Sequence, residues 1–250
     1  MLAVRNVTKG AEAARTIAGS VSVEQLDLAD LASVRHFARH WEDDIDLLIN
    51  NAGVMAPPLS RTPDGFESQF GTNHLGHFAL TNLLLPQIRG RVVSVSSLAH
   101  RAGHIDFADP NWRTRRYSRW QAYGQSKLAN LLFVLELQRR LTSSGSTILA
   151  TAAHPGWAAT NLQRSNNRFA SAGIVVANRL FAQDAAAGAL PTLYASTADI
   201  PGASFVGPNG RGQTRGTPTL VGRSDAAADA TLARRLWDLS EELTGVTEGR

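Results

Sequence analysis

Short apolar segments alternate along the chain with longer segments whose apolar residues gather on one helical face. The short segments predict β-strands near residues 1–4, 21–26, 46–49, 91–95, 147–152 and 203–206. The longer ones predict helices near residues 8–18, 31–41, 65–85, 122–141, 184–197 and 229–243. Such alternation is typical of an α/β protein whose parallel sheet is covered by helices on both faces. We therefore expect a single domain over residues 1–250.

Polar residues at the edges of these segments predict where helices begin. Asp30 or Ser33 can cap the second helix, and Asp64 can cap the third. Residues 207–224 are rich in Gly, Pro and Arg, and we expect an irregular loop there.

The composition indicates a globular protein, with 43% hydrophobic and 18% charged residues in a chain of 250. The absence of cysteine excludes disulfides and thiolate metal sites and is compatible with a reducing cytoplasm. Spanning a bilayer takes roughly 20 apolar residues, and no run approaches that length. The apolar start of the chain, Met1 to Val4, is too short for a signal peptide. We expect a cytoplasmic protein without a membrane span.

Four arginines account for part of the net charge of +4 and lie close together before residue 123. A nucleic-acid patch would normally interleave aromatic residues in a recognisable motif, and none is present. We therefore favour a solvated loop and expect no nucleic-acid partner. The four residues are Arg113, Arg115, Arg116 and Arg119.

Several histidines could suggest a metal site. Their spacing matches no closed site, and no thiolate is available as a further ligand. We expect no metal at His74, His77, His100 and His104.

Tyr123 and Lys127 lie four residues apart at the start of a predicted helix, which places both side chains on one helix face. An ammonium group beside a phenol favours the phenolate, so the pair could form an acid/base with a lowered tyrosine pKa. Taken alone, the same spacing usually indicates an amphipathic surface helix.

Other polar residues follow predicted strands. Ser96 and Ser97 end the apolar strand near 91–95, where ligands of parallel sheets bind, although two serines can also simply begin a turn. A hydroxyl at this place can stabilise negative charge on a substrate oxygen. The turn Asn50-Asn51-Ala52-Gly53 follows another strand, and Asn73 is a polar residue within an apolar helix.

With these residues together, the chain closely resembles the short-chain dehydrogenase/reductase family, whose Asn-Asn-Ala-Gly turn, strand-end serine and Tyr-x-x-x-Lys helix occur in the same order. The likeness covers nearly the whole chain. It is closest to the retinol-dehydrogenase-like and protochlorophyllide-reductase-like branch. The segments that carry this are Thr72-Asn73-His74-Leu75-Gly76-His77-Phe78, Ile105-Asp106-Phe107 and Ser126-Lys127-Leu128-Ala129-Asn130.

The resemblance implies a Rossmann-type doubly wound parallel sheet and an oxidoreductase that uses NAD(P) on CH–OH groups. It implies that Tyr123 is the general acid/base and that Lys127 lowers its pKa and holds the nicotinamide ribose. Ser97, rather than Ser96, would orient the substrate oxygen. Asn73 would hold a water that links Lys127 to solvent.

The resemblance also implies cofactor contacts beyond Tyr123 and Lys127. The turn after the third strand would border the ribose and adenine, and the end of the second strand would touch the adenine. Arg5, with Lys9, occupies the place that selects the ribose substituent, and an arginine there favours NADP, with NAD the alternative. The further contact residues are Asp27, Leu28, Asn51, Ala52, Gly53, Pro155, Gly156 and Thr160.

The family fold begins with a strand and a glycine-rich turn that receives the pyrophosphate, and this chain begins at what resembles the second strand. The glycines at 207, 210 and 212 are no substitute, because no helix follows them. In the family the first strand lies in the middle of the sheet, so its neighbours must either pair with each other or leave two open edges. We expect a weakened cofactor site or an unstable fold.

A start codon assigned too far downstream would also explain this beginning. The family commonly has an apolar β-branched residue at this position, and a valine codon can serve as a bacterial start. An intact mass of the native protein that matches Met1 would contradict this hypothesis.

The preferred function is hydride transfer between NADP(H) and an apolar alcohol, aldehyde or ketone. The alternative is a non-catalytic or cofactor-impaired remnant that acts as a scaffold or interaction protein. A homo-oligomer through the Tyr-x-x-x-Lys helix is a further expectation. Aromatic residues that could line a substrate pocket, or equally belong to the core, are Trp112, Trp157, Phe169 and Phe181.

Overall fold

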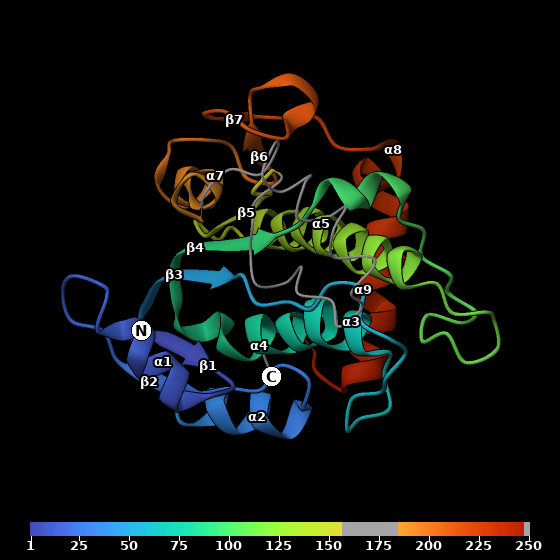
Figure 1. Ribbon diagram of the computed structural model, residues 1–250, viewed down its shortest axis with the longest axis horizontal. Helices are drawn as coiled ribbons and strands as arrows, with labels where there is room; N and C mark the ends of the chain where they lie inside the picture. Colours follow the sequence, from blue (N-terminus) through green and yellow to red (C-terminus); the bar gives the residue numbers. More distant parts are fainter. Residues whose placement is uncertain (157–184, 248–250) are drawn as a thin grey trace, which may run out of the picture.

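The computed structural model describes residues 1–156 and 185–247, and within them the strands form two separate sheets (Figure 1). The larger sheet has the order β3-β4-β5-β6-β7, in which β7 alone is antiparallel to its neighbour. The smaller sheet is the parallel pair β1-β2. The strands are β1 (Leu2–Val4), β2 (Val23–Gln25), β3 (Ile45–Asn50), β4 (Ile88–Val95), β5 (Leu149–Ala153), β6 (Phe205–Pro208) and β7 (Pro218–Leu220).

The helices connect these strands in the alternating order that the hydrophobic pattern predicts. Together with the parallel strands they confirm a Rossmann-like α/β fold. The α-helices are α1 (Val7–Ala14), α2 (Leu31–Arg39), α3 (Ser68–Phe70), α4 (Gly76–Leu84), α5 (Arg119–Ser143), α7 (Ala185–Thr197), α8 (Asp225–Ala228) and α9 (Ala230–Thr244). A π-helical turn forms η1 (Gly71–Leu75), and short 3-10 helices form η2 (Leu85–Gln87), η3 (Leu98–Ala102) and η5 (Arg211–Gln213).

The differences from the predicted elements are local. The helix expected near 65–85 begins at Ser68 and is interrupted by η1, a π-helical turn. Its N-cap is Glu67 instead of Asp64, because the Asp64 carboxylate accepts the backbone N–H of Leu31 at 3.0 Å and so helps Asp30 to cap α2. The segment expected to be an irregular loop contains β7, which pairs with β6.

The two sheets divide between β1 and β3. Within the described residues β1 pairs only with β2, and β3 pairs with β4, so both strands have an unpaired edge. Leu47 and Ile49 of β3 are exposed, as expected for a strand at the edge of its sheet. Of the two arrangements that the sequence allows, the structure has the one with two open edges.

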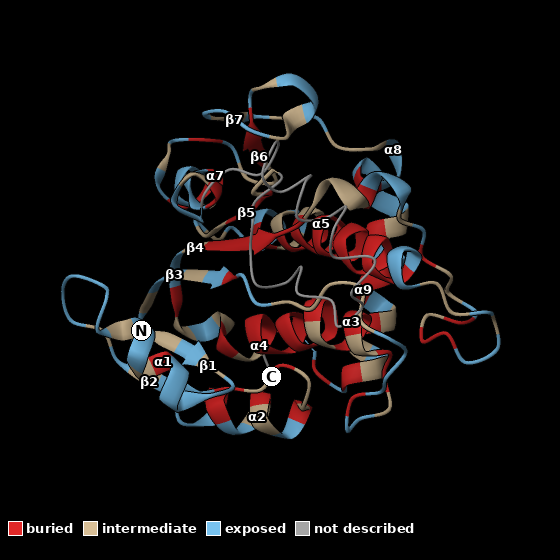
Figure 2. Cartoon of the chain, in the orientation of Figure 1, coloured by how far each residue is buried: buried red, intermediate tan, exposed pale blue. Residues whose placement is uncertain are grey.

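The core surrounds α5, which packs on β4 and β5 on one side and on α9 on another. Figure 2 shows buried residues running through β4, α4 and α5, whereas β1, β2 and α1 are largely exposed. At the junction of α4, α5 and α9, Phe133 and Trp237 stack, and Phe78 meets both rings edge to face. Every residue of α5 from Ala122 to Val134 is buried within the single chain. The face through which we expected a homo-oligomer is therefore already covered along this stretch.

Gly76 allows α4 to cross closely over the turn that follows β2. A methyl group at this position would overlap the backbone carbonyl oxygen of Leu28. The glycine of the Asn-His-Leu-Gly segment is thus needed for packing, and it brings Asn73, one turn earlier, to the side of the sheet where α5 lies.

Candidate active site

Tyr123 and Lys127 lie one turn apart in the buried part of α5, with exposed fractions of 8% and 5%. The Lys127 Nζ donates a hydrogen bond to the carbonyl of Val95 at 3.0 Å and lies 5.7 Å from the centre of the Tyr123 ring. Asn130 donates to the same carbonyl at 3.0 Å. The end of β4 therefore holds the helix that carries the pair. The amphipathic surface helix that remained an alternative is ruled out, because this segment is buried.

The two serines after β4 have different surroundings. The Ser96 hydroxyl is buried and donates to the backbone carbonyl of Lys127 at 2.7 Å, so it joins β4 to α5. The Ser97 hydroxyl is half-buried, accepts the N–H of Ala99 at 3.2 Å, and hydrogen-bonds with the Tyr123 side chain. This geometry supports the choice of Ser97 as the residue that meets the substrate.

Burial determines the protonation of both groups on α5. Burial raises the pKa of Tyr123, and the hydrogen bond with Ser97 offsets this only in part. Burial also lowers the pKa of Lys127 to about 8. The net pKa of Tyr123 is therefore raised, opposite to the lowered value that we expected, because loss of water outweighs the hydrogen bond with Ser97. Tyr123 is therefore a neutral phenol near pH 7 and can donate a proton.

Asn73 lies in the π-helical turn η1, where the wider backbone brings its side chain toward the loop after β3. Its amide exchanges two hydrogen bonds with the backbone of Val54, at 2.8 and 2.9 Å, and donates a third to the Ser126 hydroxyl at 2.9 Å. The backbone carbonyl of Asn73 lies 3.0 Å from His77 Nδ1. Asn73 therefore connects the loop after β3 with α5. The sequence alone did not reveal its contact with Ser126.

Gly53 lies against both Asn73 and Lys127. A methyl group at this position would be 3.1 Å from Asn73 Oδ1 and 3.6 Å from Lys127 Nζ. The Asn51-Ala52-Gly53 turn therefore lies beside two of the candidate catalytic residues, with Asn51 and Ala52 exposed. The small residue leaves a ligand room to approach Lys127, which is an arrangement that fits a nicotinamide ribose.

The other expected cofactor residues also follow parallel strands, as ligands of such sheets require. Arg5 is exposed just past β1, and Asp27 follows β2, with its carboxylate accepting the N–H of Ala29 at 2.9 Å. The Leu28 side chain is buried, which leaves mainly its backbone for a ligand. Pro155 and Gly156 follow β5.

Gly156 has a positive φ of 69°, which favours glycine, and a methyl group there would overlap the carbonyl of Thr214. Thr160 lies outside the described residues, as do Trp157, Phe169 and Phe181.

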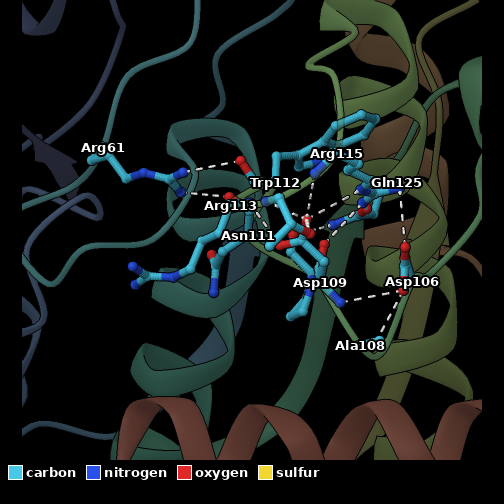
Figure 3. A network of polar contacts seen from close by, with 11 residues as sticks. Arg61, Asp106, Ala108, Asp109, Asn111, Trp112, Arg113, Arg115 and Gln125 are labelled. Carbon is cyan, nitrogen blue, oxygen red and sulfur yellow. Dashed lines mark hydrogen bonds and ion pairs between the residues drawn. The ribbon is translucent and has the colours of Figure 1, made fainter.

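The segment between η3 and α5 is organised around Asp109 (Figure 3). Its carboxylate accepts the backbone N–H groups of Arg113, Thr114 and Arg115 at 2.7 to 3.2 Å. Burial alone would raise the pKa of Asp109, but these hydrogen bonds hold it well below its usual range. The segment therefore has a fixed conformation.

Two residues of the segment have structural roles. Arg115 donates to Gln125 on α5 at 2.8 Å and stacks 3.5 Å above the ring of Trp112. Trp112 is only 3% exposed and therefore belongs to this cluster, not to an open substrate pocket. Arg115 of the arginine cluster is likewise engaged within the chain.

A second group of buried polar residues joins three parts of the site, and sequence patterns did not reveal it. Gln69 accepts the N–H of Ala56 at 2.8 Å and donates to the Tyr117 hydroxyl and the Arg119 carbonyl, both at 3.0 Å. Tyr117 donates to the Glu67 carboxylate at 2.9 Å. We call Glu67, Gln69 and Tyr117 the polar clamp. It connects the loop after β3 to the first turn of α5, four residues before Tyr123.

Comparison with known proteins agrees with this geometry. A family model described as short chain dehydrogenase matches residues 1–171. Retinol dehydrogenase 13 of Homo sapiens is 43% identical, over 98% of this chain and 77% of the human protein. Retinol dehydrogenase 12 of Mus musculus is 40% identical, over 98% of this chain and 78% of the mouse protein. A crystal structure of an uncharacterized protein from Mycobacterium paratuberculosis has a TM-score of 0.83 and 54% identity, covering 99% of this chain and 84% of that one.

The chain belongs to the short-chain dehydrogenase family. It is accordingly an oxidoreductase of the class that uses NAD(P) on CH–OH groups of small molecules. Within residues 1–156 and 185–247, no helix has the length and apolar character needed to cross a membrane.

Proposed function

We propose that this protein interconverts an apolar alcohol and its carbonyl compound with NADP(H), using Tyr123 as the proton donor and acceptor. The observation that carries the proposal is that Tyr123 and Lys127 lie one turn apart in the buried part of α5, with the Ser97 hydroxyl at the Tyr123 phenol. The bound nicotinamide would supply or accept the hydride at the substrate carbon.

Side chains of the protein supply the proton that the substrate oxygen receives in this reaction. In carbonyl reduction the neutral Tyr123 hydroxyl gives its proton to the substrate oxygen, and the Ser97 hydroxyl stabilises the charge that develops there. The phenolate that forms is stabilised by the ammonium of Lys127, because two opposite charges in a buried site attract strongly. In alcohol oxidation the same groups act in reverse. Asn73 supports them by holding the loop after β3 to Ser126 of α5, and its part in a proton relay to solvent stays a prediction.

The residues fit the nicotinamide half of the cofactor better than the phosphate half. Gly53 leaves space beside Lys127, and Arg5 offers a positive charge for the 2′-phosphate of NADP. In contrast, β1 leads into α1 through Arg5 and Asn6 without a glycine, and its neighbouring edge is unpaired.

The proposed substrate is apolar because the similar curated proteins are named retinol dehydrogenases. Retinal is therefore the first carbonyl compound to test, with a short polar aldehyde for comparison. A cytoplasmic location stays a prediction, supported by the absence of cysteine.

Replacement of Tyr123 by phenylalanine tests the proposed chemistry. NADPH-dependent reduction of retinal should fall at least about 100-fold, because a positioned general acid typically contributes 10²–10⁴-fold. Tyr194→Phe is the matched control, since this exposed phenol of α7 lies outside the site. Tyr123→Phe activity within a few-fold of the unaltered protein, with unaltered circular dichroism, would refute the role of Tyr123.

The split between the two sheets supports one alternative function, a remnant that retains the scaffold but binds cofactor poorly. Titration of the 250-residue chain with NADPH, followed by nicotinamide fluorescence, distinguishes the two. Saturable binding favours the enzyme. Absence of binding, together with absence of turnover, favours the remnant.

A further inference from the structure

His100 is a buried histidine that the mechanism above does not use, and it holds Ser97 directly. Its Nδ1 lies 2.7 Å from the backbone carbonyl oxygen of Ser97, and its own backbone N–H donates to the same oxygen at 3.0 Å. The side chain is fully buried in η3. The backbone carbonyl of Ser97, the proposed substrate contact, is thus held by both the side chain and the backbone of His100.

The partners of the ring determine its tautomer. The carbonyl of Ser97 can only accept a hydrogen bond, so Nδ1 carries the proton. The backbone N–H of Ser224 can only donate, and it reaches Nε2 at 3.2 Å, so Nε2 carries none. The imidazole is therefore neutral when both bonds are made.

The charges around the ring agree with this state. Burial lowers the pKa of His100, the hydrogen bond to Ser97 partly offsets this, and the neighbouring Arg101 and Arg223 lower the pKa further. The buried imidazole of His154 is nearby and is also held neutral, because burial lowers its pKa to about 4.

The ring also links the site to the C-terminal part of the chain. Ser224 lies between β7 and α8, and Arg101 donates to the carbonyl of Gly222 in the same connection at 3.2 Å. The ring of Phe205 on β6 meets the imidazole edge to face, with 5.5 Å between ring centres. The His100 ring is therefore held by Ser97 on one side and by Ser224 and Phe205 on the other.

We propose that His100 is a positioning residue for Ser97, whose neutral imidazole holds the Ser97 carbonyl and so directs the Ser97 hydroxyl toward Tyr123. The inference rests on the proposed function, because it assigns to Ser97 a role in stabilising charge on the substrate oxygen. A histidine that only anchored the connection before α8 would affect stability without acting through Ser97.

Two substitutions separate the nitrogens of the ring. In His100→Asn the amide nitrogen can occupy the place of Nδ1 and still donate to Ser97. In His100→Gln the amide reaches the place of Nε2 and can still accept from Ser224. We expect kcat for retinal reduction to fall about tenfold in His100→Gln, a fraction of the 10²–10³-fold that removal of an oxyanion donor typically costs. His100→Asn should restore most of this loss, and KM for NADPH should stay constant in both.

A double substitution shows whether the effect passes through Ser97. Ser97→Ala alone should lower kcat about 100-fold or more, and His100→Gln should then cause no further loss in that background. The positioning role is overturned if His100→Gln lowers kcat by the same factor in the unaltered protein and in the Ser97→Ala background. It is also overturned if His100→Gln leaves kcat unchanged while Ser97→Ala lowers it. In both cases the role of Ser97 itself stands. If Ser97→Ala leaves kcat unchanged, both fail, while the Tyr123→Phe result still reports on the acid.

One measurement needs no variant. Imidazole ¹⁵N chemical shifts of the unaltered protein report the protonation of each ring nitrogen. At neutral pH we expect a protonated Nδ1 and an unprotonated Nε2 for His100. A charged imidazolium or the opposite tautomer would overturn the proposal even if the variants fail to fold.

Discussion

Tyr123 shows how strongly its surroundings determine what a side chain can do. The same phenol on an exposed helix would titrate near its ordinary pKa of about 10. In this protein, burial raises the pKa of Tyr123, so the protonated form is present throughout the neutral range. Lys127, with a pKa lowered to about 8, is still largely charged near pH 7. A neutral acid next to a cation is suited to reduce a carbonyl, because the anion left after proton transfer has a stabilising partner.

Arg5 provides a test of cofactor preference. It is exposed and lies at the carboxyl end of β1, where its charge can attract a 2′-phosphate. Arg5→Glu should weaken NADPH binding at least about tenfold, equivalent to about 1.4 kcal/mol, since it replaces attraction with repulsion. NADH has no 2′-phosphate, and its affinity should be nearly unchanged.

Fluorescence titration of both cofactors would measure the effect of Arg5→Glu. Arg15→Glu is the control, because it makes the same change of charge at an exposed position just past the other end of α1. Equal losses for NADPH and NADH, or none, would show that Arg5 does not select the cofactor.

The first turn of α5 and the loop after β3 come from distant parts of the chain, and the polar clamp joins them. Its members meet in a specific pattern of donors and acceptors, in which Tyr117 accepts from Gln69 and donates to Glu67. Burial and the nearby Glu67 carboxylate raise the pKa of Tyr117, so the hydroxyl keeps its proton. The clamp therefore fixes the helix that carries Tyr123 against the loop that carries Gly53.

Tyr117→Phe tests how much the clamp stabilises the fold. The change keeps the ring that meets Trp112 edge to face but leaves the Glu67 carboxylate and one Gln69 N–H without this partner. The free energy of unfolding should fall by about 1–3 kcal/mol, the usual cost of an unsatisfied buried polar group.

Urea denaturation would measure the effect of Tyr117→Phe. Tyr194→Phe removes an equivalent hydroxyl from a surface position, and surface changes usually stay within about 0.5 kcal/mol. Equal stability of the two variants would mean that the clamp contributes nothing beyond a surface hydroxyl.

The molecule as a whole has an interior rich in neutral histidines. Burial lowers the pKa of His74 to about 3 and those of His77 and His154 to about 4. In the unfolded chain these groups would titrate near 6.5. Between these values the unfolded state binds more protons than the folded state, so stability falls as pH decreases.

The predicted outcome is a loss of stability on going from about pH 7 to about pH 5. Each of the three histidines can raise the unfolding equilibrium constant up to about tenfold per pH unit in this window. Buried carboxylates with lowered pKa values, such as Glu136, contribute mainly below their ordinary value of 4.5. Urea midpoints measured at several pH values in low salt would show the decrease. A midpoint that stays constant from pH 7 to pH 5 would contradict the neutral, buried state of these rings.

Local patterns were sufficient for most of the elements and for choosing the candidate proton-transfer residues. Apolar periodicity reflects which side of a strand or helix is buried, so it predicted six of the seven strands and the longer helices to within a few residues, but not β7. Asp30 was recognisable as a cap because its partner, the N–H of Ala32, is two residues away. Ser97, Tyr123 and Lys127 were recognisable as candidates because they lie in short motifs that resemble those of the family.

The remaining features depend on contacts between residues far apart in the chain. Asp64 caps α2 across 33 positions instead of starting its own helix, and His100 meets Ser224 across 124. The polar clamp and the open edges of β1 and β3 likewise arise only when segments come together. Burial raises the pKa of Tyr123, whereas the nearby Lys127 led us to expect a lowered pKa. The sequence could not show this, because loss of water depends on every segment that packs around the phenol.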